Sequence, residues 1–364
     1  IELIKGGLPA EYGGRLSSVL DIRMNDGNKK EFTAEGGIGL ISSRLKLEAP
    51  LAKDKSSFMI SGRRTYADAF LAFAKDSSIR KNTIYFYDLN AKANYQLDEK
   101  NTIYLSGYFG RDELGLNQAF GFDWGNATAS LRWNHFYSKR LFSNSSLIYS
   151  NYNYVIENFL EENNFKVNSS IRDLNLKQDF QLSLNNSHNV RFGLDMIHHS
   201  ISPGNITSSE SSSVNQIKVE KRNGSELAVY LSDEWELNER LNIVYGIRGS
   251  SFVLLGPGNF AKIDQEGNTV NSKKYGSGDI VKSYFNLEPR FSASYQLNDR
   301  SSLKGSYTRN TQNLHLMSNS TTTSPTDLYI MSSNNVKPEI ADQLSMVYFK
   351  NFSEDKYEFS AELY

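Results

Sequence analysis

Adjacent arginines, Arg63 and Arg64, are the first side chains in this sequence whose types suit a specific chemistry. A guanidinium fork matches a carboxylate or a phosphate, so the pair could bind an anion. The simpler interpretation, which we favour, is a pair of structural charges. Three further charged residues, Arg15, Glu234 and Glu288, are candidates for ion pairs between parts of the chain.

Catalytic and metal-binding patterns are missing from the sequence. It has no cysteine, which excludes disulfides, thiolate metal sites and a cysteine nucleophile. His198 and His199 are adjacent, so on a strand they point to opposite faces and cannot chelate one metal together. Neither an H-E-x-x-H motif nor a G-x-S-x-G elbow occurs. We therefore expect no enzyme, no catalytic residue, no cofactor and no metal site.

The composition favours strands and excludes some partners. The formal net charge is −1, so nothing suggests binding to nucleic acid. The chain has 21 Tyr, 21 Phe and only 7 Pro, a bias that is typical of β-strands. No apolar run approaches the roughly 20 residues that a membrane helix needs.

Alternation of apolar and polar residues is the dominant pattern in the sequence. The strands that it predicts would have to position the charged side chains named above. In residues 226–237, for example, one face carries Leu227, Val229, Leu231, Trp235 and Leu237, and the other is mostly polar. Many such segments alternate for about 9–13 residues, near the length of a membrane strand and longer than the usual soluble strand. The pattern predicts an all-β fold: a transmembrane antiparallel β-barrel with an apolar outer face and a polar inner face. From Glu31 onward we expect about fifteen strands.

The connections between these segments alternate between short and long. Short turns are expected near 53–55, 98–101, 138–141, 185–188, 238–240, 298–301 and 353–356. Longer polar connections are expected at about 64–82, 110–123, 158–164, 202–223, 256–283 and 310–336. Short turns on one side and long loops on the other are typical of outer-membrane barrels, whereas a β-sandwich has no reason to alternate in this way.

The start of the chain, residues 1–24, differs from the rest. Two short apolar strands, 1–4 and 19–22, flank a glycine-rich turn that carries a tyrosine. Glycine permits a positive φ and a close approach of the backbone to a neighbouring wall. The turn contains Lys5, Gly6, Gly7, Tyr12, Gly13, Gly14 and Arg15.

This run resembles the end of the plug domain in TonB-dependent outer-membrane receptors. In that family a strand, a K-G-G turn, a Y-G element and a final strand lead directly into the barrel wall. Residues 31–51 resemble the first two barrel strands, and 61–66 resemble the end of the third. Residues 335–339 resemble an N-L-K-P-E element, with Val336 in place of Leu. The resemblance spans the chain, and the variant at 6–18 is similar to receptors of the Bacteroidota-type envelope.

The resemblance implies a domain division. Residues 1–28 would be the C-terminal end of the plug, and 29–364 a partial transmembrane barrel. A complete barrel of the family would have 22 strands. An unpaired strand edge is costly in hydrocarbon, so the last strand, at 357–364, predicts further strands beyond it. We therefore expect the chain to start and end within a longer protein.

The resemblance also implies a function: energised uptake of a scarce nutrient across the bacterial outer membrane. The cargo would be a siderophore, a corrinoid, an oligosaccharide or a peptide. The expected partners are the TonB–ExbB–ExbD complex, acting through a segment absent from this chain, outer-membrane lipid and lipopolysaccharide, and the extracellular ligand. A surface lipoprotein is a further candidate partner in Bacteroidota-type envelopes.

The resemblance gives the charged residues two interpretations. Arg15, Glu234 and Glu288 would form plug–barrel ion pairs, or else be solvated wall charges. Arg63 and Arg64 would be lumenal or loop charges that contact the plug or lipopolysaccharide.

Two other functions remain open at this point. The first is a passive, substrate-specific outer-membrane channel in which the N-terminal segment is only a constriction. The second is a surface β-rich binding module, whose apolar faces would be buried inside.

Overall fold

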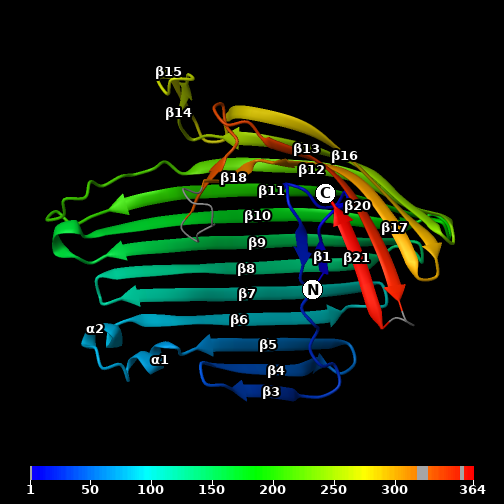
Figure 1. Ribbon diagram of the computed structural model, residues 1–364, viewed down its shortest axis with the longest axis horizontal. Helices are drawn as coiled ribbons and strands as arrows, with labels where there is room; N and C mark the ends of the chain where they lie inside the picture. Colours follow the sequence, from blue (N-terminus) through cyan, green and yellow to red (C-terminus); the bar gives the residue numbers. More distant parts are fainter. Residues whose placement is uncertain (1, 318–326, 353–355) are drawn as a thin grey trace.

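One large antiparallel sheet dominates the computed structural model, which describes residues 2–317, 327–352 and 356–364 (Figure 1). Within these residues the sheet has 15 strands, and each strand pairs with its neighbours in chain order. The strand order runs from β3 at one edge to β21 at the other. The structure confirms the predicted all-β fold and the expected number of strands.

The strands of the large sheet are long. Their bounds are β3 (Thr33–Ile38), β4 (Ser42–Ala52), β5 (Ser56–Thr65), β6 (Thr83–Gln96), β7 (Asn101–Leu116), β8 (Phe120–Phe136), β9 (Leu141–Asn158), β10 (Phe165–Ser183), β11 (His188–Thr207), β12 (Arg222–Asn238), β13 (Leu241–Leu255), β16 (Ile280–Asn298), β17 (Ser301–Gln312), β20 (Glu339–Phe352) and β21 (Tyr357–Leu363).

The remaining elements are small. In the described residues, three two-stranded pairs are formed by β1 (Glu2–Ile4) with β2 (Val19–Asp21), β14 (Gly258–Ile263) with β15 (Thr269–Tyr275), and β18 (Leu314–Met317) with β19 (Leu328–Met331). The short helices are α1 (Asp68–Leu71), α2 (Ser77–Arg80) and the 3₁₀ turn η1 (Glu161–Asn163). No helix in the described part of the chain is long and apolar enough to cross a membrane.

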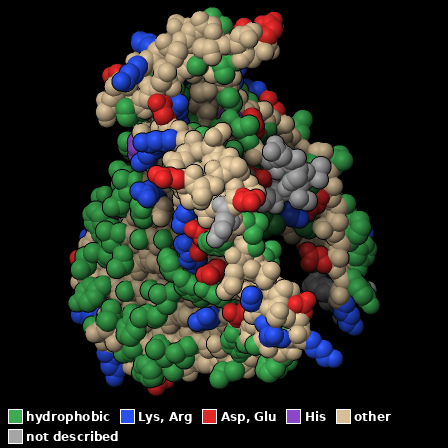
Figure 2. Space-filling model, turned by 90° about the vertical axis from the view of Figure 1, so that its left-hand side faces the viewer, with side chains coloured by type: hydrophobic (Ala, Val, Ile, Leu, Met, Phe, Trp, Pro, Cys, Tyr) green, Lys and Arg blue, Asp and Glu red, His purple; other side chains and the backbone are tan. Residues whose placement is uncertain are grey.

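The two faces of the sheet differ in polarity. The N-terminal segment lies against one face, which we call the lumen side, and we call the opposite side the outer face (Figure 1). On β12 the outward residues Leu227, Val229 and Leu231 are about half exposed, whereas Ala228 and Tyr230 between them are buried. Hydrophobic side chains gather over the outer flank of the wall in Figure 2. This arrangement is the reverse of a water-soluble barrel and is typical of a membrane barrel.

Connections alternate between the two ends of the sheet, as predicted. The short turns join β4 to β5, β6 to β7, β8 to β9, β10 to β11, β12 to β13 and β16 to β17 at one end (Figure 1). The turn predicted near 353–356 falls largely on residues 353–355, outside the described residues, and so does part of 310–336. At the other end, the long connections carry α1, α2 and the β14–β15 and β18–β19 pairs.

One predicted long connection, 110–123, is wrong. Strand β7 continues to Leu116 and strand β8 begins at Phe120, so that only residues 117–119 connect them. The charged residues that suggested a loop are cross-strand partners instead: Arg111 Nε donates to Asp123 Oδ2 at 2.6 Å. Opposite charges on facing strands extend a hairpin rather than ending it.

An apolar cluster lies at the end of the sheet with the long connections. It joins strand residues to residues of the small hairpins: Ile201, Phe252, Leu254, Phe260, Leu314 and Met331. Because Phe260 belongs to β14 and Met331 to β19, the cluster ties these hairpins to the wall.

Candidate functional site

The N-terminal segment is held against the lumen side of the wall. Its two strands pair with each other, with Leu3 opposite Leu20, and neither is hydrogen-bonded to the large sheet. Between them, Leu8 and Ala10 are almost completely buried. The segment is therefore fixed to the wall by side chains and not by a shared sheet.

Two buried wall arginines contact the backbone of the segment. Arg290 on β16 donates to the carbonyl oxygens of Leu8, at 3.3 Å, and of Pro9. Arg248 on β13 donates to the Ala10 carbonyl at 3.4 Å. Charge-assisted hydrogen bonds are stronger than neutral ones, and a carbonyl accepts them whatever its side chain.

Each of these arginines also has a carboxylate partner in the wall. Arg290 Nη2 lies 3.0 Å from Glu288 Oε2, and Arg248 Nη2 lies 3.3 Å from Asp195 Oδ2. Glu288 accepts a second hydrogen bond, from the Ser250 hydroxyl at 2.7 Å. Because a buried charge is costly unless it is paired, these carboxylates keep the arginines in the lumen wall.

Three further wall cations extend the contact. Lys177 on β10 donates to the Glu11 carbonyl at 3.2 Å, and Arg191 Nη1 on β11 lies 2.8 Å from Glu11 Oε1. Lys92 on β6 donates to the Met24 carbonyl at 2.7 Å and pairs with Asp26 at 2.7 Å. The segment is therefore bound by a line of cations that spans strands β6 to β16.

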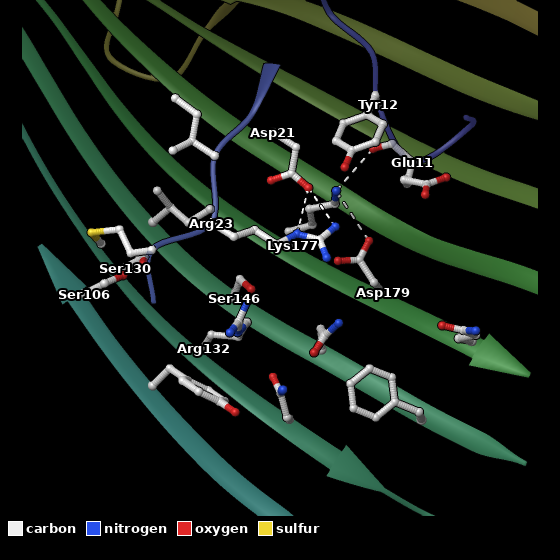
Figure 3. A pocket seen from close by; sticks show the side chains of 18 of the residues that line it. Glu11, Tyr12, Asp21, Arg23, Ser106, Ser130, Arg132, Ser146, Lys177 and Asp179 are labelled. Atoms are coloured by element: carbon white, nitrogen blue, oxygen red, sulfur yellow. Dashed lines mark hydrogen bonds and ion pairs between the residues drawn. The ribbon is translucent and has the colours of Figure 1, made fainter. Parts of the chain in front are cut away.

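Tyr12 is part of this contact. The Lys177 ammonium lies 5.3 Å from the centre of its ring, a cation–π distance. Burial raises the pKa of the Tyr12 phenol, and the neighbouring carboxylates of Asp21 and Glu11 raise it further. Figure 3 shows Tyr12 and Glu11 above Lys177, with Asp179 on its other side.

A cavity of about 920 Å³ lies between the segment and the wall. The segment contributes Tyr12, Asp21 and Arg23, and the wall contributes polar side chains such as Ser130 and Arg132 (Figure 3). The wall residues come from the half of the strands next to the short turns. Among the described residues, no group of three or more His, Asp or Glu side chains is arranged to hold a metal ion.

The structure brings most of the predicted turn residues together at this contact. Gly6 lies against Ser345, and Gly7 has φ +63°, which favours glycine. Gly13 faces Arg248 so closely that a Cβ would lie 2.4 Å from its Nε. Gly14, with φ +76°, lies near the carboxylate of Glu226.

Arg15, Glu234 and Glu288, the candidates for ion pairs between the segment and the wall, make no direct ion pair of this kind among the described residues, whereas the turn residue Lys5 lies close to a wall carboxylate. Lys5 is 3.9 Å from Glu362, and Arg15 is exposed and donates to the Gly14 carbonyl. Glu288 is buried with Arg290, and Glu234 accepts a hydrogen bond from Asn242 on the neighbouring strand.

The two adjacent arginines point to opposite faces, as neighbours on a strand must. Arg63 shares the lumen face with Met59 and pairs with Asp88, with 2.8 Å between Nε and Oδ2. Arg64 shares the outer face with Ile60 and lies 5.0 Å from the centre of the Tyr85 ring.

Sequence reasoning missed the cations that hold the segment: Lys92, Lys177, Arg191, Arg248 and Arg290. A weak signal was present, because each occupies a polar-face position in the middle of an alternating strand. A charge there faces the lumen and needs a partner inside it. Nothing in the spacing shows that these partners belong to the N-terminal segment, at residues 8–11 and at Met24 and Asp26.

A wall with an apolar outer face, alternating short and long connections and a separate segment bound in its lumen defines a class: outer-membrane barrels with an internal plug. The family model described as TonB dependent receptor-like, beta-barrel matches residues 56–364. The chain belongs to this family.

Solved structures with a similar fold include several receptors and a transporter. The copper transporter OprC is 13% identical with a TM-score of 0.68, and the match covers 96% of this chain and 56% of that one. A mutant of the ferric enterobactin receptor PfeA of Pseudomonas aeruginosa is 15% identical with a TM-score of 0.65, covering 99% and 56%. The siderophore receptor PirA of Acinetobacter baumannii is 14% identical with a TM-score of 0.63, covering 96% and 55%.

The chain therefore spans little more than half the length of these structures. At such identities the likeness establishes the fold and not the cargo. No curated protein matched the sequence.

Proposed function

We propose that the complete protein is a receptor for TonB-energised uptake of a scarce nutrient across the outer membrane. The observation that carries this proposal is the N-terminal segment bound in the lumen by wall cations on its backbone carbonyls. A passive pore has no need for a separate segment fixed in this way. The long connections would then face the outside of the cell, and the short turns the periplasm.

In this proposal residues 1–28 are the C-terminal end of the plug, and 29–364 are part of the barrel. The boundary is supported by contacts at the end of the segment. A Cβ on Gly27 would lie 2.1 Å from the Phe58 carbonyl oxygen, so the chain touches the wall there. The Asp54 amide donates to the Lys29 carbonyl at 3.0 Å, and the first wall strand, β3, follows shortly after.

The contact is suited to holding the plug and also to releasing it. Arg248, Arg290 and Lys177 each have a wall carboxylate as well as a carbonyl of the segment. If the segment moves, these cations keep their wall partners and no buried charge is left unpaired. Each lost bond to a charged donor costs roughly 1.5–3 kcal/mol, so a pulling force can break them one after another.

The partners follow from this mechanism. A TonB–ExbB–ExbD complex would supply the pull through a segment outside this chain, and the ligand would bind the long connections. A surface lipoprotein would cover those connections if the envelope is of the Bacteroidota type. The proposed cargo remains one of four kinds: a siderophore, a corrinoid, an oligosaccharide or a peptide.

The first experiment is ligand binding to the full-length receptor in detergent, followed by uptake in cells. Calorimetry would screen ferric siderophores, corrinoids, glycans and peptides, and the hit would be followed into cells with and without TonB. Saturable binding with TonB-dependent accumulation supports the proposal. TonB-independent accumulation, with conductance in planar bilayers, would establish the passive channel instead.

A second experiment tests whether the segment must move. The chain has no cysteine, and a Cβ on Gly6 would lie 3.5 Å from the Cβ of Ser345, which is within disulfide range. In the Gly6→Cys/Ser345→Cys variant, oxidation should abolish uptake and leave ligand binding intact, and a reductant should restore uptake. Each single cysteine variant is the control. Full uptake by the oxidised double variant would show that transport leaves this end of the plug in place.

A further inference from the structure

The outer face of the wall carries a groove of about 790 Å³ near strands β3 to β7. Its floor is a row of cross-strand neighbours, in which glycines alternate with large apolar residues: Gly36, Leu45, Gly62, Leu89 and Phe109. Gly36 and Gly62 lie on either side of Leu45, so the groove exists because two side chains are missing from the row.

An added Cβ would fit at either glycine with ordinary van der Waals contacts, to Leu89 at Gly62 and to Leu45 at Gly36. A Cβ on Gly62 would meet nothing closer than 3.7 Å, and one on Gly36 nothing closer than 3.8 Å. Neither glycine has a positive φ. Both positions could therefore hold at least a Cβ without backbone strain, so neither turn geometry nor a steric clash requires glycine there.

A cation lies beside this groove, on the side closer to the long connections. Arg64 is one row further along, on the same face as Gly62, with Ser43 opposite it on β4. Its side chain is exposed and lies over the Tyr85 ring. It makes no hydrogen bond or ion pair with any residue that the structure describes.

Acidic side chains on this part of the outer face already have partners. Asp123 accepts from Arg111, and Glu113 accepts from the Tyr85 hydroxyl. Arg64 is thus left without a counter-ion beside an apolar groove. In a membrane this position lies where the apolar band gives way to polar residues, the depth of lipid headgroups.

We propose that this groove binds one phosphate-bearing lipid of the outer leaflet. An acyl chain would lie along the row of Gly36 and Gly62, and the phosphate would bind Arg64, with the Ser43 hydroxyl as a second donor. The guanidinium fork matches phosphate oxygens, and the apolar floor is continuous with the lipid-facing wall. The proposal rests on the outer-membrane placement given above.

The test uses the complete receptor in detergent, with bound lipid counted by native mass spectrometry. The probes are phosphatidic acid and diacylglycerol with identical chains, so that only the phosphate differs. We expect one retained phosphatidic acid per receptor and no retained diacylglycerol. Lipid A is then titrated as a phosphorylated lipid of the outer leaflet.

Two variants change the two halves of the groove separately. Arg64→Gln removes the cation, and Gly62→Leu fills the channel for the acyl chain. Each should weaken phosphatidic acid binding roughly tenfold, the order expected for losing one charge-assisted contact or one buried chain segment. The matched control is Arg172→Gln, which removes an exposed arginine from the outer face of β10, away from the groove, and should leave binding unchanged.

Three results would overturn the proposal: unchanged binding in Arg64→Gln, equal retention of diacylglycerol, or an equal loss in Arg172→Gln. If Gly62→Leu does not fold, Arg64→Gln decides alone, because it alters only an exposed side chain. Excess inorganic phosphate should not displace the lipid, since free phosphate cannot use the groove.

The lipid test and the uptake test can fail independently. Membrane fractionation of the wild type checks its location, and ligand uptake by Arg64→Gln should equal that of the wild type. Normal uptake without lipid retention would refute only the groove, whereas lipid retention without uptake would refute only the transport proposal.

Discussion

The two faces of strands β13 and β16 carry opposite kinds of residue: charged side chains on the lumen side and apolar side chains on the outer face. On the lumen side, Arg248, Glu288 and Arg290 are at most 5% exposed, whereas Leu287 and Phe291 on the outer face are about half exposed. Charge is buried here and apolar surface is left uncovered, because the lumen is filled by a polar backbone and the outer face is free for lipid. Burial in this wall therefore follows the partner of each face and not the hydrophobicity of each side chain.

The largest expected effect on stability comes from removing the contacts that Arg290 makes on the lumen side. Replacing Arg290 by Met leaves Glu288 buried without its cation and removes the bonds to the Leu8 and Pro9 carbonyls. Breaking a buried pair in this way should cost about 3–5 kcal/mol of unfolding free energy. Urea unfolding in lipid vesicles, followed by tryptophan fluorescence, measures the loss.

The control for Arg290 is an exposed pair on the same sheet. Arg309 and Asp342 form an ion pair on β17 and β20, and both are more than 40% exposed. Arg309→Met should change the unfolding free energy by less than about 1 kcal/mol. Similar losses in the two variants would mean that the lumen contact adds nothing special to stability.

The second effect tests the outer face with charge. Leu131 is 47% exposed on the outer face of β8, and an arginine there should cost about 2–4 kcal/mol if it meets hydrocarbon near the midplane. The neighbouring Ser130 lines the lumen cavity, which has room for the new side chain, so Ser130→Arg should be much milder.

A second pair of neighbours, Ile243 and Asn242 on β13, repeats this test. Ile243→Arg should behave like Leu131→Arg, and Asn242→Arg like Ser130→Arg, in the same unfolding assay. If arginine were tolerated equally on both faces, the assignment of an outer and a lumen face would be wrong.

A smaller effect should come from crowding the junction between segment and wall. A methyl group on Gly27 would overlap the Phe58 carbonyl oxygen, which is backbone and cannot rotate away. Overpacking of this kind typically costs about 1–3 kcal/mol, so Gly27→Ala should unfold at a lower urea concentration. Gly305→Ala is the matched control, because nothing lies within 4 Å of its Cβ position. If Gly27→Ala unfolded at the same urea midpoint as the wild type, the segment would be free to shift away from the wall at this point.

The smallest effect concerns pH at the long connections. Glu220 accepts a hydrogen bond from the Asn259 amide and pairs with Arg222, and these two contacts hold the pKa of its carboxyl below the ordinary value. A lowered pKa stabilises the folded form above the ordinary carboxyl pKa, and this stabilisation is lost as pH falls through the lowered value.

Amide exchange of the β14–β15 hairpin should therefore quicken, relative to its intrinsic rate, as the medium becomes acidic enough to protonate Glu220. Glu220→Gln should remove this pH dependence and leave exchange in β12 unchanged. If amide exchange in the hairpin had the same pH dependence in the wild type and in Glu220→Gln, the Glu220 carboxylate would not be what holds the hairpin.

Strand number, strand faces and the order of connections could be predicted from sequence because they are local patterns. Leu227 and Ala228 differ in face because successive side chains on a strand alternate. The prediction went wrong at residues 110–123, where Arg111 and Asp123 look like loop charges. Their pairing across two strands depends on register, which short-range patterns do not reveal.

The candidate site was predictable on one side only. The glycines and Tyr12 of the segment stand in a recognisable run, so the sequence identified the part of the chain that needs close contact. The wall residues that meet it, Arg248 and Arg290, are more than 200 positions away, since the contacts span separations of 238 and 281–282 residues.

By itself, the sequence determined the all-β class, the inverted faces and the family, because each depends on alternation or on a contiguous motif. Only the tertiary structure decided which wall cations bind the segment and which groups of the segment they contact. Those outcomes depend on how fifteen strands curve and on which carbonyl lies within hydrogen-bonding distance of each guanidinium. The energy of such a contact is set by distance and burial, and neither is encoded by neighbours in the chain.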